Sequence, residues 1–356
     1  MNGVLVCAGE AKSKNIGDYI QSVAQEQFFS HTDCFVEREH LNTFKAKEKV
    51  NVIMNAWFMW HPENFPPSDI INPLFISFHL VPSIADRFLT KETISYLKKY
   101  EPIGARDTNT QALLEKHGIK SYFSGCLTLT LGLKCKKSQR NNLIYFVDPF
   151  YELGMGENCK FLRVISALRL FFKNPIKIIR LNKIFSLESH TSLSKISPKL
   201  DRLLLCASFY NCYSKKFSDE LLFNAKYLTH QVKQSLFSCD DDKMAYARDL
   251  INKYAKAKLI ITSRIHCALP CLGVETPVLF VNSNKLDQGV RRSGGRFGGL
   301  INLLHTLRWT PDGIVYDSFR IEGKIDSKTI IENKPDYKTL KDNLIVKVRE
   351  FINKYE

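Results

Sequence analysis

Residues 258–281 carry two short apolar runs that are separated by a small turn and a further apolar segment. The first run, Leu259–Ile261, stops just before Ser263, and the second, Pro277–Val281, begins shortly after Gly273. Runs that are apolar throughout at this length are typical of parallel strands buried on both faces. The stretch therefore predicts a strand, a turn, a helix and the next strand, as in an α/β fold.

The predicted helix in this stretch begins beside groups that favour an anion. Ser263 is placed to cap the helix, which puts Arg264 and His266 in its first turn. Free backbone N–H groups and the helix dipole attract negative charge at that end. The pattern indicates an anion site with a titratable imidazole. A plain strand–helix unit, with Arg264 in a surface ion pair and His266 in a structural contact, fits the same residues.

Polar residues also follow the first predicted strand, Gly3–Ala8. The loop after it contains Asn15, Gly17 and Asp18 and leads into an amphipathic helix that ends near Phe29. Sheets of α/β proteins bind ligands at the carboxyl ends of their strands. Asn15 and Asp18 are therefore candidates for hydrogen bonds to a sugar, and Asp18 for a base. The alternative is that Asp18 is only a cap or a first-turn acid.

Arg106 stands between a predicted strand, Pro102–Ala105, and a predicted helix, Thr108–His117. Asp107 is the expected N-cap of that helix, and Gly118 is its expected stop. A guanidinium at the carboxyl end of a strand can bind a carboxylate or a phosphate through two parallel hydrogen bonds. A purely structural network of Arg106 with Asp107 is the alternative.

An aromatic cluster that begins at Trp57 follows a predicted strand over Val50–Ala56. Apolar faces of sugars stack on indoles, so Trp57 is a candidate platform for an acceptor sugar. Burial in the core is the alternative interpretation of such a cluster. A further strand is expected at Leu74–His79.

Composition limits the classes of partner and cofactor. The formal net charge of +15 suits an acidic partner, although a solvated lysine-rich surface explains it equally well. The ten cysteines are scattered without a CxxC pair, which predicts reduced thiols and no metal site. No apolar run is long enough to span a membrane, and the first residues lack a signal-peptide pattern. We therefore expect a cytoplasmic protein.

The segment 160–183 is basic and amphipathic. No acidic residue occurs between Asn158 and Leu187, while lysines and arginines alternate with large apolar residues. Such a segment can lie on an anionic membrane surface, at the inner face of the membrane in this case. A helix with its apolar stripe on the protein core is the alternative. Pro175 should divide the segment into two pieces.

A polar, basic stretch at 134–142 precedes a fresh strand, Leu143–Val147, and is the expected boundary between two domains. The predicted division is 1–140, 141–335 and a C-terminal helix within 336–356. That helix, Tyr337–Tyr355, is expected to pack across both domains.

The segment Ser263–Phe280, SRIHCALPCLGVETPVLF, resembles the hallmark segment of the polysaccharide pyruvyl transferase family. Two further regions agree with that family. One comprises Gly104–Asp107 and Ser124–Thr130, and the other is Asn15–Asp18. The segments stand in the family's order and span most of the chain.

The resemblance implies an α/β fold of two Rossmann-like lobes, similar to glycosyltransferases of the B type, with mostly parallel sheets and the site in the interlobe cleft. It also implies transfer of the pyruvate unit of phosphoenolpyruvate to two hydroxyls of one sugar, which gives a cyclic ketal and phosphate. The acceptor would belong to a surface-polysaccharide or lipid-linked oligosaccharide precursor. Phosphoenolpyruvate is the donor substrate, and no cofactor is expected.

The functional Arg–His–Lys set of the family corresponds to Arg106 and His266 by motif, and to Lys285 by its place after the hallmark strand. In this hypothesis Arg106 binds the anionic end of the donor, Lys285 neutralises the phosphate and His266 is the general acid. The expected donor-binding residues are Arg106, Ser263, Arg264, His266 and Lys285, and the expected acceptor-binding residues are Asn15, Gly17, Asp18 and Trp57.

Two other functions fit the sequence. One is a glycosyltransferase of the same two-lobed fold that uses a nucleotide sugar. The other is a non-catalytic basic adaptor that binds a membrane or another polyanion, although nucleic acid is not expected as a partner. Stabilisation by phosphoenolpyruvate, by a nucleoside diphosphate or by neither distinguishes the three.

Overall fold

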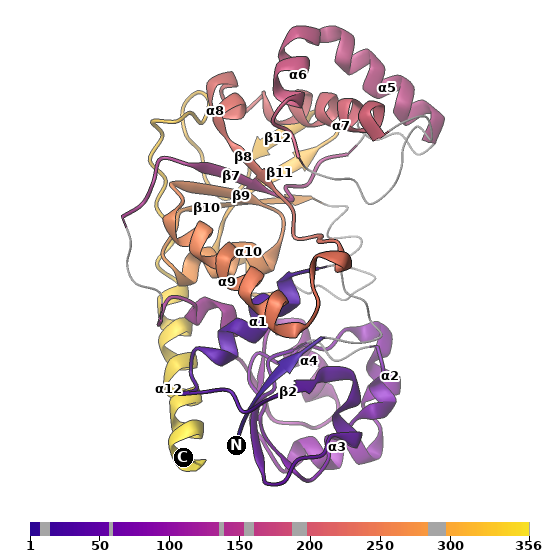
Figure 1. The fold of residues 1–356 in the computed structure, drawn as a ribbon, viewed down its shortest axis with the longest axis vertical. Coiled ribbons are helices and arrows are strands. Elements are labelled where there is room, and N and C mark those ends of the chain that lie inside the picture. The colour runs from indigo at the N-terminus through magenta and orange to yellow at the C-terminus, as the bar shows by residue number, and fades with distance from the viewer. Residues whose placement is uncertain are drawn as a thin grey trace.

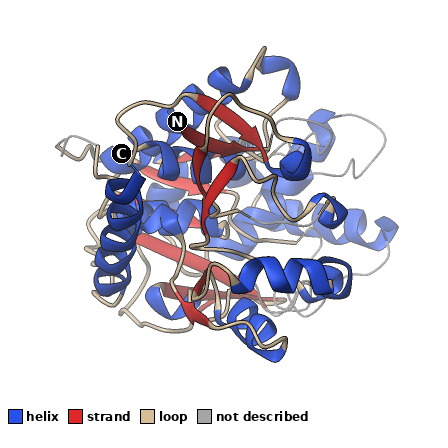
Figure 2. Ribbon diagram, turned by 90° about the horizontal axis from the view of Figure 1, so that it is seen from below, coloured by secondary structure: helices blue, strands red, loops and turns tan. Residues whose placement is uncertain are grey.

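The structure is a computed structural model that describes residues 1–7, 15–56, 60–134, 139–152, 160–186, 198–283 and 297–355. Strands run through the middle of the molecule and helices lie outside them (Figure 2). The elements form two lobes, which we call the first lobe, with β1 to β6, and the second lobe, with β7 to β12 (Figure 1).

The first lobe contains a sheet of parallel strands. Their order is β2 (Cys34–Glu37), β1 (Asn2–Val6), β3 (Val50–Ile53) and β4 (Ile71–Leu74). A parallel pair, β5 (Ile103–Ala105) and β6 (Ser121–Phe123), continues beside it. Phe78 forms a parallel bridge with Ala105, which joins this pair to the segment after β4.

The second lobe contains a six-stranded sheet. Its order is β12 (Gly313–Tyr316), β11 (His305–Thr310), β10 (Val278–Ser283), β9 (Leu259–Thr262), β7 (Ile144–Val147) and β8 (Lys226–Leu228). All neighbouring pairs are parallel except β11 with β12. The expected α/β class with mostly parallel sheets is confirmed.

The two sheets share one topology. In each, the strand that comes first in the chain, β1 or β7, lies between the second and third strands. The strand order therefore reverses between β1 and β3 and again between β7 and β9. In open α/β sheets the carboxyl ends of the strands at such a switch point form the usual ligand site.

Helices cover the sheets and fill the space between the lobes. They are α1 (Gly17–Glu26), α2 (Ala85–Phe88), α3 (Lys91–Lys98), α4 (Thr108–Lys116), α5 (Lys160–Lys173), α6 (Pro175–Asn182), α7 (Pro198–Tyr213), α8 (Asp219–Asn224), α9 (Asp240–Lys256), α10 (Ile265–Gly273) and α12 (Tyr337–Tyr355). A 3-10 turn, η4 (Leu127–Thr130), follows β6. The predicted break at Pro175 and the predicted helix over Tyr337–Tyr355 are both confirmed.

The strand expected at Leu74–His79 is wrong in position. The sheet uses β4, which ends at Leu74, and the chain then turns at Ser77, whose φ is +55°. A positive φ interrupts a strand, so only Phe78 resumes pairing, with Ala105. The Ser77 N–H donates to the Ser124 hydroxyl at 3.1 Å, which stabilises the turn.

One apolar core continues across the junction of the lobes. It includes buried side chains from β1 and α1 of the first lobe and from α9 and α10 of the second, together with η4 and α12. Figure 1 shows α1 beside α9 and α10 between the two sheets, and α12 alongside the first lobe. Among the described elements, the chain changes lobe between η4 and β7 and again between β12 and α12. Because the core is shared, the predicted division into separate domains stays a prediction.

Candidate active site

The start of α1 meets the start of α10 at the junction of the lobes. A Cβ at Gly17 would lie 3.2 Å from the Cβ of His266 and 3.1 Å from the side-chain oxygen of Asn15. The backbone N–H of Gly17 donates to that oxygen at 3.2 Å. Just before the helix, the Ile16 N–H donates to the His230 carbonyl of the second lobe at 2.9 Å. The structure thus brings the predicted acceptor loop against the predicted general acid, and the missing side chain of Gly17 permits the approach.

Ser263 does not cap α10, so that prediction is wrong. The N-cap is Arg264, and the helix begins at Ile265. The Ser263 hydroxyl instead donates to the Val281 carbonyl at 2.5 Å and accepts from the Phe150 N–H at 2.7 Å. These bonds tie the end of β9 to β10 and to the loop after β7. A buried hydroxyl needs partners, and here the partners come from neighbouring strand ends rather than from the helix N–H groups that it was expected to satisfy.

Arg264 is held by a carboxylate that the sequence analysis did not select. Its Nε donates to Asp148 Oδ2 at 3.1 Å, and the His230 N–H donates to the same oxygen at 2.9 Å. Asp148 follows β7 with a φ of +41°, at the switch point between β7 and β9. The signal was present, because Asp148 comes directly after a predicted strand. The side chain of Arg264 is 32% exposed, so its charge also reaches solvent.

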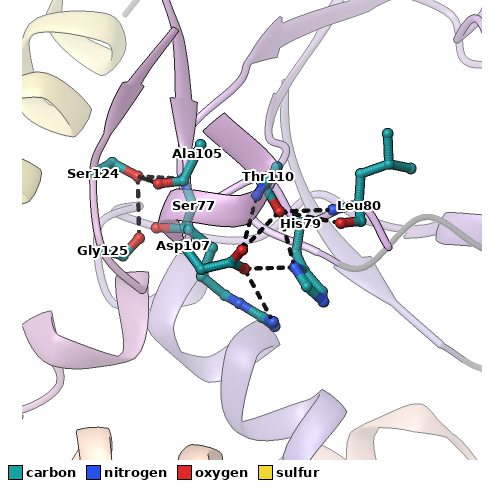
Figure 3. Close-up of polar contacts among 9 residues, drawn as sticks. Ser77, His79, Leu80, Ala105, Asp107, Thr110, Ser124 and Gly125 are labelled. Carbon is teal, nitrogen blue, oxygen red and sulfur yellow. Dashed lines mark hydrogen bonds and ion pairs between the residues drawn. The ribbon is translucent and has the colours of Figure 1, made fainter. Parts of the chain in front are cut away.

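A buried polar network surrounds Asp107, the neighbour of Arg106, in the first lobe (Figure 3). Arg106 Nη2 lies 3.5 Å from Asp107 Oδ2, and His79 Nδ1 lies 2.6 Å from the same oxygen. The Thr110 N–H donates to Asp107 Oδ1 at 2.9 Å, which confirms Asp107 as the N-cap of α4. Burial alone would raise the pKa of Asp107, but His79, Arg106 and the Thr110 N–H outweigh it and lower that pKa.

His79 is a further residue that the sequence analysis did not select. Its backbone N–H donates to the Ala56 carbonyl at 3.2 Å, and its ring faces the carboxylate of Asp107 in Figure 3. The residue was visible as the last position of a predicted strand, where polar side chains gather. Its pairing with Asp107 depends on the long-range bridge between Phe78 and Ala105, which no local pattern reveals.

A second charged cluster lies at the carboxyl ends of β1 and β2. Cys7, Asp18 and Arg38 line one small void there. The Nε of buried Arg38 donates to Glu39 Oε1 at 2.9 Å. Asp18 occupies the first turn of α1, as one of the two interpretations expected, and it adds a negative charge within reach of Arg38. Arg38 is a cation at a strand end that the sequence analysis missed.

Next to His266 in the chain, Cys267 of α10 belongs to a buried polar cluster that includes His230 and Tyr254. Burial alone would raise the pKa of the Cys267 thiol, but interactions with Cys271, His230 and Thr262 outweigh it and lower that pKa to about 6. His230 Nε2 lies 2.7 Å from the Tyr254 hydroxyl. Because His230 also binds Asp148 through its N–H, this cluster positions the start of α10.

Two selected residues, Trp57 and Lys285, lie outside the described residues, and their roles stay predictions. A cavity of about 750 Å³ lies at the far end of α1 from Gly17. Its lining includes Glu26 of α1 and Arg248 of α9, which form an ion pair across the junction. This cavity is separate from the meeting point of Gly17 and His266, so the position of the interlobe cleft stays a prediction.

Within the described ranges, no group of three or more His, Cys, Asp or Glu side chains is arranged to hold a metal ion. None of the helices in those ranges is long and apolar enough to cross a membrane.

Comparison with known protein families gives a match that includes all three of the segments named above. The model of the family described as polysaccharide pyruvyl transferase matches residues 15–285, which is most of the chain. No curated protein matches the chain, and no solved structure matches it. The chain therefore belongs to the polysaccharide pyruvyl transferase family and is a transferase that acts on polysaccharide.

Proposed function

We propose that the protein transfers the pyruvate unit of phosphoenolpyruvate to two hydroxyls of one sugar. The observation that supports this proposal best is the approach of Gly17 to the Cβ of His266, because it sets the loop proposed to bind the acceptor hydroxyls beside the proposed general acid at the start of α10. The membership in the family supplies the pyruvyl group as the transferred unit.

The reaction forms two C–O bonds to the central carbon of the donor and breaks its C–O bond to phosphate. The methylene carbon gains one proton, and the two hydroxyls lose two, so the second proton leaves with phosphate or a base. Asp18 is a candidate base, and His266 is the proposed donor of the methylene proton. The neutral and charged forms of an ordinary histidine are both accessible near neutral pH, which suits an acid that must be reprotonated.

The anionic donor is proposed to bind at the start of α10. Arg264 reaches solvent there, and Asp148 fixes its guanidinium. The first N–H groups of the helix favour a carboxylate or phosphate at the same place. Of the carboxylate and the phosphate of the donor, one is proposed to bind at this helix start and the other to bind Arg106. Lys285 is a further proposed ligand of the donor, and Ser263 is proposed to support the site. Asn15, Gly17, Asp18 and Trp57 are proposed to hold the acceptor, in a surface-polysaccharide or lipid-linked oligosaccharide precursor.

A thermal-shift titration with phosphoenolpyruvate, UDP and inorganic phosphate tests the donor. Phosphoenolpyruvate should stabilise the fold by about 2.7 kcal/mol at a hundredfold excess over its dissociation constant, and UDP should not. Arg264→Ala should abolish this shift. Arg87→Ala, which removes a different ion-paired arginine at the surface, should leave it unchanged. In His266→Ala the shift should persist while ketal formation stops.

Each other outcome has a definite meaning. A shift by UDP alone would replace the donor by a nucleotide sugar. An equal shift by phosphate would show a general anion site. No shift by any of the three compounds would leave the adaptor, or a donor site that forms only after the acceptor binds. Full turnover in His266→Ala would remove His266 as the acid.

A further inference from the structure

Helices α5 and α6 are apolar on two sides. On their inner side, Ala167, Ile178 and Leu181 are fully buried, and both helices pack on α7. This inner stripe satisfies the interpretation of the segment as a core-packing helix. An amphipathic helix that packs on a core through one apolar stripe is polar on its exposed side, so packing on α7 does not account for apolar side chains on the outer side.

The outer side of the two helices exposes large apolar side chains. Phe161 is 70% exposed, Phe172 is 73% exposed and Ile176 is 82% exposed. Apolar side chains recur along α5 at a spacing of three or four residues, at Phe161, Ile165, Leu168 and Phe172. They therefore lie on one face of the helix and form a single stripe. Single exposed apolar residues are ordinary on a protein surface, whereas a continuous stripe marks a binding surface.

Cations accompany this stripe without any acidic residue between positions 158 and 187. Lys177 pairs with Asp219 at 2.7 Å, and Arg180 lies 4.5 Å above the ring of Phe223, so these two are used within the protein. Among the side chains described there, Arg169, Lys173 and Lys183 are further exposed cations on the two helices and at the end of α6. Exposed aromatic rings flanked by lysine and arginine match the boundary between lipid headgroups and acyl chains.

The position of the helices suits a flat partner. In Figure 1, α5 and α6 lie at the end of the second lobe, and α3 lies near the opposite end of the molecule. A planar surface can therefore reach this end of the molecule without meeting the first lobe.

We propose that the outer face of α5 and α6, defined by Phe161, Leu168, Phe172 and Ile176 with Arg169 and Lys173, docks on an anionic lipid bilayer. The apolar stripe enters the interface, and the cations contact anionic headgroups. This inference does not rest on the donor chemistry. A lipid-linked acceptor would lie at the same surface, but the test below contains none.

Sedimentation with vesicles of phosphatidylcholine, with or without phosphatidylglycerol, tests the docking. At low salt the protein should bind only the vesicles that contain phosphatidylglycerol. The variant Phe161→Ser with Phe172→Ser and Ile176→Ser should bind about tenfold more weakly. The matched control changes three exposed apolar residues elsewhere, Leu236→Ser, Ile330→Ser and Val346→Ser, and should bind as the unchanged protein does.

Charge reversal provides the second arm. Arg169→Glu with Lys173→Glu should weaken binding about tenfold or more. Lys45→Glu with Lys47→Glu makes the same change in net charge on lysines of the first lobe and should have little effect. Thermal melting of each variant confirms folding. The proposal is overturned if the protein binds no vesicles at low salt, or if either control weakens binding as much as its partner variant.

Discussion

At the scale of single residues, Asp107 carries a buried charge on which the fold depends. It is fully buried, it caps α4 and it pairs with both His79 and Arg106. Its pKa is lowered in the folded protein, so the ionised form stabilises the fold at every pH above its ordinary value of about 3.9. That contribution is lost as the pH falls through the folded-state pKa, because the protonated acid no longer balances its two partners.

Asp107→Asn should therefore lower the free energy of unfolding by about 3 kcal/mol at pH 7, since it removes the buried carboxylate that pairs with Arg106 and His79. Urea unfolding between pH 7 and about pH 3 should show a difference that narrows below about pH 4. Asp249→Asn, which removes an exposed partner of Lys253, should change stability by less than about 0.5 kcal/mol. A difference that does not depend on pH would contradict the role given to the charge.

Predictions from the sequence succeeded for residues whose partners are local. Asp107 caps the helix that begins at the next residue, and Thr110 is three positions away. They failed for Ser263, because its hydroxyl bonds to the carbonyl of Val281, eighteen residues further along the chain. Asp148 acquires its importance only through Arg264, a partner 116 positions away. Local spacing contains no information on either contact.

At the scale of elements, the contact of α10 with η4 leaves no room for a side chain at Gly273. A Cβ at Gly273 would lie 2.8 Å from the carbonyl oxygens of Leu129 and Leu131 and 2.9 Å from that of Thr128. These are backbone atoms, so no side chain can move aside to make room. The last turn of the hallmark helix therefore requires glycine for close approach rather than for an unusual φ.

Gly273→Ala should destabilise the protein by about 2 to 3 kcal/mol, because it forces α10 away from η4. Gly323→Ala is the comparison, since Gly323 has a φ of +72° but a Cβ added there would meet no atom within 4 Å. It should cost only about 1 kcal/mol from backbone strain. Denaturant unfolding of both variants provides the measurement. An equal decrease in the free energy of unfolding would show that the close approach at Gly273 contributes nothing to stability.

Element prediction was reliable where periodicity and breakers agree. The bounds of α12 and the break at Pro175 followed from apolar spacing and from the missing N–H of proline. The strand expected at Leu74–His79 was misplaced because the residues there are apolar enough for a strand, while the turn at Ser77 is set by its bond to Ser124. Apolar content predicted a strand in this region but not the residues at which the strand begins and ends.

At the scale of the whole molecule, the shared core predicts that the two lobes unfold together. Calorimetry should show one transition. Leu97→Ala in the first lobe, Ile314→Ala in the second and Leu344→Ala in α12 each remove a buried side chain, at a cost of about 2 to 5 kcal/mol. Each variant should lower the temperature of the same single transition. A peak that splits in any of them would show that the lobes are independent.

The sequence allowed the family and the α/β class to be predicted, because three separated segments carry the resemblance. It did not reveal that both sheets have the same strand order, since the order of strands depends on contacts between distant segments. It also did not reveal that α1 packs on α9 and α10. The apolar faces of these helices were visible, but an apolar face does not specify its partner.

The double passage of the chain between the lobes has a geometric consequence. One covalent connection would leave two bodies free to turn about three axes, as a single joint does. Here η4 leads into β7 at one passage, and the chain returns after β12 to α12 at the other. If both passages hold their places, the lobes can rotate only about the line that joins them. Any opening that admits a substrate then has one degree of freedom, and its direction is set by where the two passages lie.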